Sequence, residues 1–111
     1  VLYVETSEEM PSAGSVYRFF AALGENWILQ KIRALIVGIP KTRFMQQIPP
    51  EGRKNYMINQ RNAINQALQD YEVSHLPVVF NLHFGHVDPQ IIIPNGNTVI
   101  IDGKQEKIFF E

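Results

Sequence analysis

The sequence predicts a small α/β domain: a mostly parallel sheet with flanking helices and short β-hairpins at its C-terminal edge. Three observations predict it. Short apolar runs occur near residues 1–5, 34–38 and 76–81, and two segments between them carry apolar residues at helical spacing. After residue 90 the pattern changes to short β runs separated by turn dipeptides. Strands that alternate with helices favour parallel pairing through crossovers, and 111 residues suit one domain, residues 1–111.

The first strand and the first helix have recognisable limits. Residues 1–5 are four apolar residues followed by the carboxylate of Glu5, where the strand is expected to end. Ser12 is a candidate N-cap for a helix over residues 13–23, and Gly24 stands where a left-handed C-cap is expected. The apolar positions of this helix recur every three or four residues: Val16, Phe19, Phe20 and Leu23. We expect Phe19, Phe20 and the following Trp27 to lie in the core.

The middle of the chain predicts a strand, a loop, a helix and another strand. Residues 34–38 form an apolar run typical of a strand buried on both faces. Residues 39–53 contain three prolines among polar residues, which indicates an exposed loop that can form a substrate rim. Residues 55–71 predict a long helix, with Gln60 off its apolar stripe of Met57, Ile64, Ala67, Leu68 and Tyr71. Residues 76–81 are the third strand.

The end of the chain predicts hairpins. Residues 91–93, 98–102 and 107–110 are short β runs, and Asn95-Gly96 and Asp102-Gly103 are turn dipeptides. We expect these runs to pair at the edge of the sheet.

Composition excludes several classes of function. Ten Lys and Arg against eleven Asp and Glu leave a charge of -1, which disfavours nucleic acid and anionic membranes as partners. No cysteine is present, so thiolate metal sites and a cysteine nucleophile are excluded, and a reducing, cytoplasmic compartment is expected. The apolar start without a polar lead-in is typical of a chain cut from a larger protein just before a core strand.

Two titratable residues fall where a parallel sheet presents its ligands. Ligands bind beyond the carboxyl ends of parallel strands, and Glu5 and the segment 81–88 follow two such ends. Within that segment Gly85 allows a tight backbone path before His86 and Pro89 fixes the exit. A carboxylate that orients an imidazole, whose free nitrogen is a general base, makes up two-thirds of a hydrolytic triad. Glu5 and His86 are therefore the candidate catalytic residues.

Other interpretations of these residues stay open on sequence grounds. No serine of the chain lies in an elbow between a strand and a helix, so the nucleophile is not supplied here. Glu5 and His86 can instead be structural residues of a non-catalytic binding or interaction domain, since a carboxylate at a strand end is often a cap or a surface charge. A metal-dependent enzyme using His83, His86 and Asp88 is the third alternative, although no fourth ligand at a recognisable spacing accompanies them.

Four segments in register resemble one known family. Residues 2–9 (LYVETSEE) resemble its LFLETSEE strand end, and residues 76–89 (LPVVFNLHFGHVDP) resemble its FGH-containing segment. Residues 34–40 (ALIVGIP) are similar to its GLIVGRP strand, and residues 93–96 (IPNG) to its LPIG. The family is the serine peptidases that include LD-carboxypeptidases and the microcin C immunity protein. The resemblance covers nearly the whole chain, corresponds to the family's C-terminal domain, and is closer to the microcin-immunity branch.

The resemblance implies a Ser-Glu-His triad in which Glu5 and His86 come from this domain. The serine and the oxyanion donors would belong to an N-terminal domain of the same protein that is absent from this sequence. The substrate would be a murein peptide or a peptidyl- or aminoacyl-nucleotide, cleaved at an amide bond without a metal or other cofactor. The full-length form is expected to be a homodimer, and the isolated domain to be inactive. His83, Val87 and Asn95 depart from the family's usual residues, so the contacts around the substrate are expected to differ.

Overall fold

The computed structural model describes residues 1–111, and it confirms the α/β class. Strands β1 (Leu2–Val4), β2 (Leu35–Gly38) and β3 (Val78–Leu82) form a parallel sheet in sequential order. Helices α1 (Ala13–Glu25) and α2 (Arg53–Asp70) connect these strands. A separate antiparallel hairpin, β4 (Val99–Asp102) and β5 (Lys107–Phe110), ends the chain.

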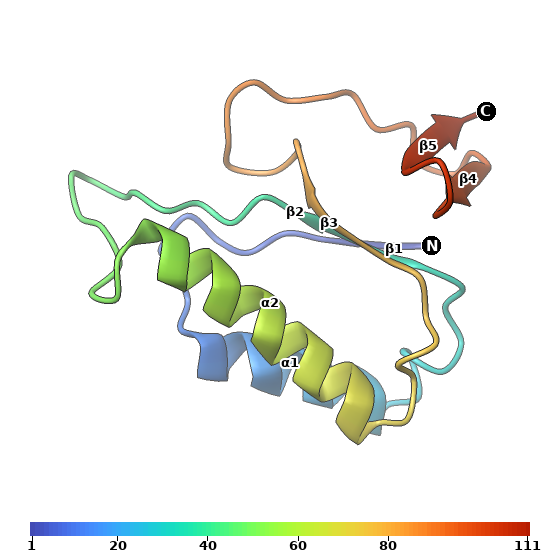
Figure 1. Cartoon of the computed structure of the whole chain (residues 1–111), viewed down its shortest axis with the longest axis horizontal. Helices are drawn as coiled ribbons and strands as arrows, with labels where there is room; N and C mark the ends of the chain where they lie inside the picture. The colour runs from blue at the N-terminus through green and yellow to red at the C-terminus, as the bar shows by residue number, and fades with distance from the viewer.

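Both helices cover the same face of the sheet (Figure 1). Crossovers of one hand that add each new strand on the same side must return along the same face, so sequential strand order dictates this arrangement. The main core lies between this face and the helices, and its most deeply buried members include Phe20, Leu29, Leu35 and Ile64. Neither helix has the length and apolar composition needed to cross a bilayer.

The start of α1 confirms the predicted cap, but its end differs from the prediction. The Ser15 backbone N–H donates to Ser12 Oγ at 3.1 Å. Gly24 is not the left-handed residue: it lies inside the helix, and a Cβ there would overlap the Tyr71 ring. The left-handed residue is Trp27 (φ 59°), with Trp27 N–H bonded to the Gly24 carbonyl and Ile28 N–H to the Leu23 carbonyl. This is a Schellman ending displaced by three residues from the predicted position.

The predicted aromatic core is correct only in part. Phe20 is fully buried, whereas Phe19 is half exposed and Trp27 is 65% exposed. Phe19 still packs edge-on against Phe20. Position 27 lies beyond the helix in a left-handed turn, so the helical spacing that suggested burial no longer applies to it.

Helix α2 buries a polar residue that its pattern placed outside the apolar stripe. Gln60 is 2% exposed and shares a face with Tyr56 and Ile64. Its amide and the Tyr56 hydroxyl both donate to the Pro11 carbonyl at 2.9 Å. This contact fixes the loop between β1 and α1 to α2 and satisfies the amide nitrogen of the buried glutamine, whereas its Oε1 has no hydrogen-bond partner.

The C-terminal region forms one hairpin, and this hairpin does not extend the parallel sheet. The predicted strand at residues 91–93 is wrong: these residues have no strand partner, and Ile92 is 93% exposed. Their one backbone contact with the preceding loop is Ile91 N–H to the His83 carbonyl at 2.7 Å. Apolar β-branched residues form a strand only where a neighbouring edge accepts their hydrogen bonds.

Candidate active site

Glu5 and His86 lie beyond the carboxyl ends of the two outer strands. Glu5 follows β1 directly, and His86 lies in the loop after β3. Because β2 separates these strands, the loop after β3 must pass over the end of β2 to reach Glu5. Gly38 ends β2, and a Cβ there would stand 2.9 Å from the Phe84 carbonyl oxygen. Because glycine has no side chain at position 38, the His86 loop can cross the edge of the sheet.

Gly85 allows the final approach of the loop to Glu5. Its φ of 94° lies in the left-handed region, where glycine is unstrained. A Cβ at this position would overlap Glu5 Oε2, so the carboxylate occupies the space that any other residue would fill. The sequence analysis assigned Gly85 a tight backbone path, and the structure adds this contact with the carboxylate.

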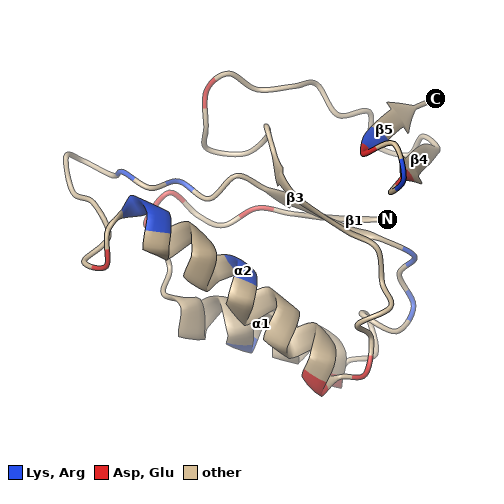
Figure 2. Cartoon of the chain, in the orientation of Figure 1, with Lys and Arg blue, Asp and Glu red and all other residues tan.

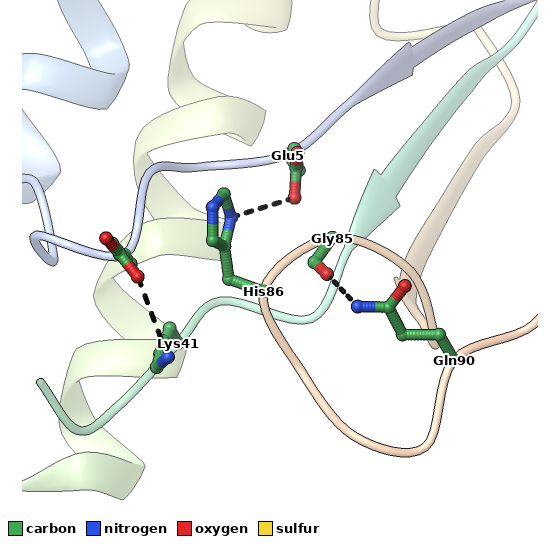
Figure 3. A network of polar contacts seen from close by, with 6 residues as sticks. Glu5, Lys41, Gly85, His86 and Gln90 are labelled. Atoms are coloured by element: carbon green, nitrogen blue, oxygen red, sulfur yellow. Dashed lines mark hydrogen bonds and ion pairs between the residues drawn. The ribbon is translucent and has the colours of Figure 1, made fainter.

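The two side chains meet in a direct polar contact. His86 Nδ1 lies 3.2 Å from Glu5 Oε2 (Figure 3), although 81 positions separate them in the sequence. Nδ1–H of the imidazole donates to the carboxylate in this arrangement, which leaves Nε2 as a free acceptor. Each side chain is 41% exposed. The pair is thus oriented on one side and open on the other.

Polar contacts within the loop maintain its path around His86. The Gln90 side-chain amide donates to the Gly85 carbonyl (Figure 3). The Tyr3 ring meets the Phe84 ring edge-on, with 6.1 Å between centroids, which ties the loop to β1. The peptide bond between Asp88 and Pro89 is cis. Sequence reasoning missed Gln90, because nothing in a lone glutamine indicates the carbonyl it will reach.

Tyr3 lies beneath this loop. Burial raises the pKa of the Tyr3 phenol above its ordinary value. Its hydroxyl is buried without a hydrogen-bond partner. Tyr3 therefore stays neutral and serves as packing for Phe84.

The proposed metal ligands do not assemble. His83, His86 and Asp88 line one open cleft, but no three histidine, aspartate or glutamate side chains of the chain form a group that could hold a metal ion. The geometry of these donors therefore does not support the metal-dependent alternative.

The fold and the site together define an α/β domain with a carboxylate–imidazole pair at the carboxyl edge of its sheet. The model of the LD-carboxypeptidase C-terminal domain matches residues 1–101. The chain belongs to this family, as the four sequence segments predicted.

The structural comparison agrees with this assignment. Four chains from solved structures match, one of them the MccF-like protein from Streptococcus pneumoniae in complex with AMP. That chain is 28% identical, with a TM-score of 0.71 over 99% of the present chain. The present chain spans 28% of its length. Among curated protein sequences, none matches.

Proposed function

We propose that this chain supplies the base and the orienting acid of a serine hydrolase that cleaves an amide bond. His86 is the general base and Glu5 holds it. The observation that carries the proposal is the 3.2 Å contact between His86 Nδ1 and Glu5 Oε2 at the carboxyl edge of the sheet. A binding domain with merely structural Glu5 and His86 would not need an imidazole held on one nitrogen and open on the other.

The reaction proceeds by acyl transfer. His86 Nε2 takes the proton of a serine hydroxyl as its oxygen attacks the substrate carbonyl, and then returns the proton to the leaving amine. Glu5 keeps Nδ1 protonated and stabilises the imidazolium that forms between these steps. Water afterwards hydrolyses the acyl-enzyme by the same proton transfers.

The serine comes from a further domain of the same protein. None of the four serines of this chain lines the cleft beside His86, and Ser12 and Ser15 are hydrogen-bonded to one another at the start of α1. The open side of His86 supports a site completed by a second surface. The oxyanion donors lie in that domain as well, so the isolated chain is inactive.

The substrate is a murein peptide or a peptidyl- or aminoacyl-nucleotide. The family supports the first, and the AMP named with the pneumococcal MccF-like protein supports the second. The full-length protein acts in the cytoplasm as a homodimer, without a metal or other cofactor. Its mass in solution tests the dimer.

The test compares hydrolysis of both substrate classes by the full-length protein and its variants. His86→Ala is expected to lower kcat/KM roughly a thousandfold or more, and Glu5→Gln roughly a hundredfold or more, because the first removes the base and the second its orientation. His75→Ala is the matched control, since His75 lies in the turn that precedes β3, at the opposite end of that strand from His86, and lines a different cleft. Activity that survives in His86→Ala contradicts the proposal.

The chain of 111 residues provides a second test. It is expected to show no turnover on its own, because the nucleophile is lacking. Hydrolysis by this chain alone that disappears in His86→Ala would mean that the nucleophile lies within it.

A further inference from the structure

A cleft of about 390 Å³ opens beside His86, next to the start of α2. The loop after β2 forms one wall, the first turns of α2 form another, and residues of the His86 loop form the third. His86 itself lines the cleft, so a group bound there lies next to the imidazole. Nothing in the Glu5–His86 pair explains why this space is kept open.

The charged residues around the cleft are mostly positive. Lys41, Arg43 and Arg53 line it, and Asp88 is the one carboxylate among its lining residues. Figure 2 shows these basic positions on the loop after β2 and at the start of α2. The whole chain has a net charge of -1, so the positive charge here is local. A local excess of cations attracts anions.

Two of these cations form no ion pair within the chain. Lys41 Nζ forms a long ion pair with Glu8 at 3.9 Å, while neither Arg43 nor Arg53 forms one. Exposed cations without partners are common on protein surfaces, so a further feature is needed to distinguish a site from a solvated face.

Arg53 supplies that feature. Its Nε donates to Thr42 Oγ1 at 2.8 Å, and Thr42 is itself 8% exposed. The bond uses the inner nitrogen of the guanidinium and fixes the orientation of its plane. It leaves the two terminal nitrogens, which bind carboxylate and phosphate in a fork, for a ligand. This fixed orientation distinguishes Arg53 from a freely solvated surface arginine.

We propose that this cleft is an anion-binding subsite of the substrate site. Arg53 binds a carboxylate or phosphate group of the substrate beside His86, and Lys41 and Arg43 add electrostatic attraction. The placement of that group next to the cleaved bond rests on the proposed function. The binding itself does not. A carboxylate belongs to a murein peptide and a phosphate to a peptidyl-nucleotide, and both suit a guanidinium held by Nε.

The test is an NMR titration of the chain with inorganic phosphate and, separately, with acetate. Chloride keeps the ionic strength constant, so general screening does not change between points. We expect saturable shifts at Thr42, Arg53 and His86 with at least one anion. The anion that binds with the higher affinity then indicates which substrate class the subsite binds.

Two variants with equal loss of charge make the test specific. Arg53→Gln is expected to weaken binding roughly tenfold or more, because a charge-assisted fork is lost. Lys54→Gln removes the same charge one position along α2, but Lys54 does not line the cleft. The anion affinity of this variant should therefore stay close to that of the unsubstituted chain. Arg53→Lys keeps the charge without the fork and is expected to bind at an intermediate level.

The dispersion of the amide spectrum shows whether each variant keeps its fold. If Arg53→Gln unfolds, the comparison of Arg53→Lys with Lys54→Gln decides. Unsaturable shifts, or equal affinities for the Arg53 and Lys54 variants, overturn the subsite. This outcome is independent of hydrolysis. If the chain binds anions and the full-length His86→Ala variant is still active, the proposed function is rejected and the anion-binding subsite is retained.

Discussion

Residues 1–76 and residues 77–111 differ in how far their side chains are buried. Every buried residue lies in the first region, and the last of them is Leu76. The second region contains His86, the edge strand β3 and the hairpin, and none of its residues is fully buried. The contrast teaches that packing provides the stability of this domain, while close backbone approaches and a few polar contacts position its imidazole.

The largest predicted effect tests this division. Ile64→Ala removes a side chain that is 2% exposed in the core and is expected to lower the free energy of unfolding by about 2–5 kcal/mol. Ile100→Ala in β4 removes the same atoms from a side chain that is 44% exposed, and a loss below about 1 kcal/mol is expected. Urea unfolding of both variants measures the difference. Equal losses would mean that the hairpin belongs to the stabilising core.

The next prediction concerns the site and not the fold. Gly85 and Gly96 both have a positive φ, so alanine at either position strains the backbone by roughly 1 kcal/mol. Only at Gly85 would the new Cβ overlap Glu5, whereas nothing lies within 4 Å at Gly96. Gly85→Ala should lower kcat of the full-length protein about a hundredfold through misplacement of the pair, and Gly96→Ala should leave it unchanged. Equal activities of the two variants would reject the role given to Gly85.

Alkaline pH is the mildest of the three tests, and the tyrosines that it ionises all lie in the first region. All four tyrosines, Tyr3, Tyr17, Tyr56 and Tyr71, lie there, and the pKa of each is raised. Burial, with the nearby Glu51 carboxylate, raises the pKa of Tyr56 to about 12. The hydrogen bond to Glu25 is the main cause that raises the pKa of Tyr71 to about 12.

The sign of the pH effect follows from these shifts. A raised pKa in the folded state means that stability is complete below the unfolded value near 10 and is lost as pH rises from there through about 12. Tyrosinate absorbance and urea unfolding across this range measure it. In the Tyr71→Phe variant, a smaller share of the tyrosinate absorbance should appear at the high-pH end of this range. A transition of all tyrosines at their ordinary pKa would contradict the packing described for this region.

The sequence predicted most of the first region, because its signals are local or periodic. Ser12 caps α1 through a bond within one helical turn, and the apolar run at residues 34–38 forms the central strand. The error at Trp27 came from the local turn that ends α1, and two others came from contacts between distant residues. Gly24 is small because Tyr71 packs on it, and Gln60 is buried because the Pro11 carbonyl accepts its amide.

The second region was harder to predict. Residues 91–93 have the composition of a strand but no edge to pair with. The sequence nevertheless indicated that Glu5 and His86 would meet, because both follow strands of one parallel sheet. The bond between Arg53 and Thr42 could not be anticipated, since it joins a loop and a helix whose approach only the fold determines.

The most direct measurement of the central claim is the tautomer of His86, determined by NMR that resolves the two ring nitrogens. Where the ring carries a single proton, the account predicts that this proton is on Nδ1, facing Glu5, and that Nε2 is bare. It also predicts that Glu5→Gln shifts the Nδ1 signal. A ring protonated on Nε2 and unaffected by Glu5→Gln would contradict the pairing on which the proposed hydrolysis rests.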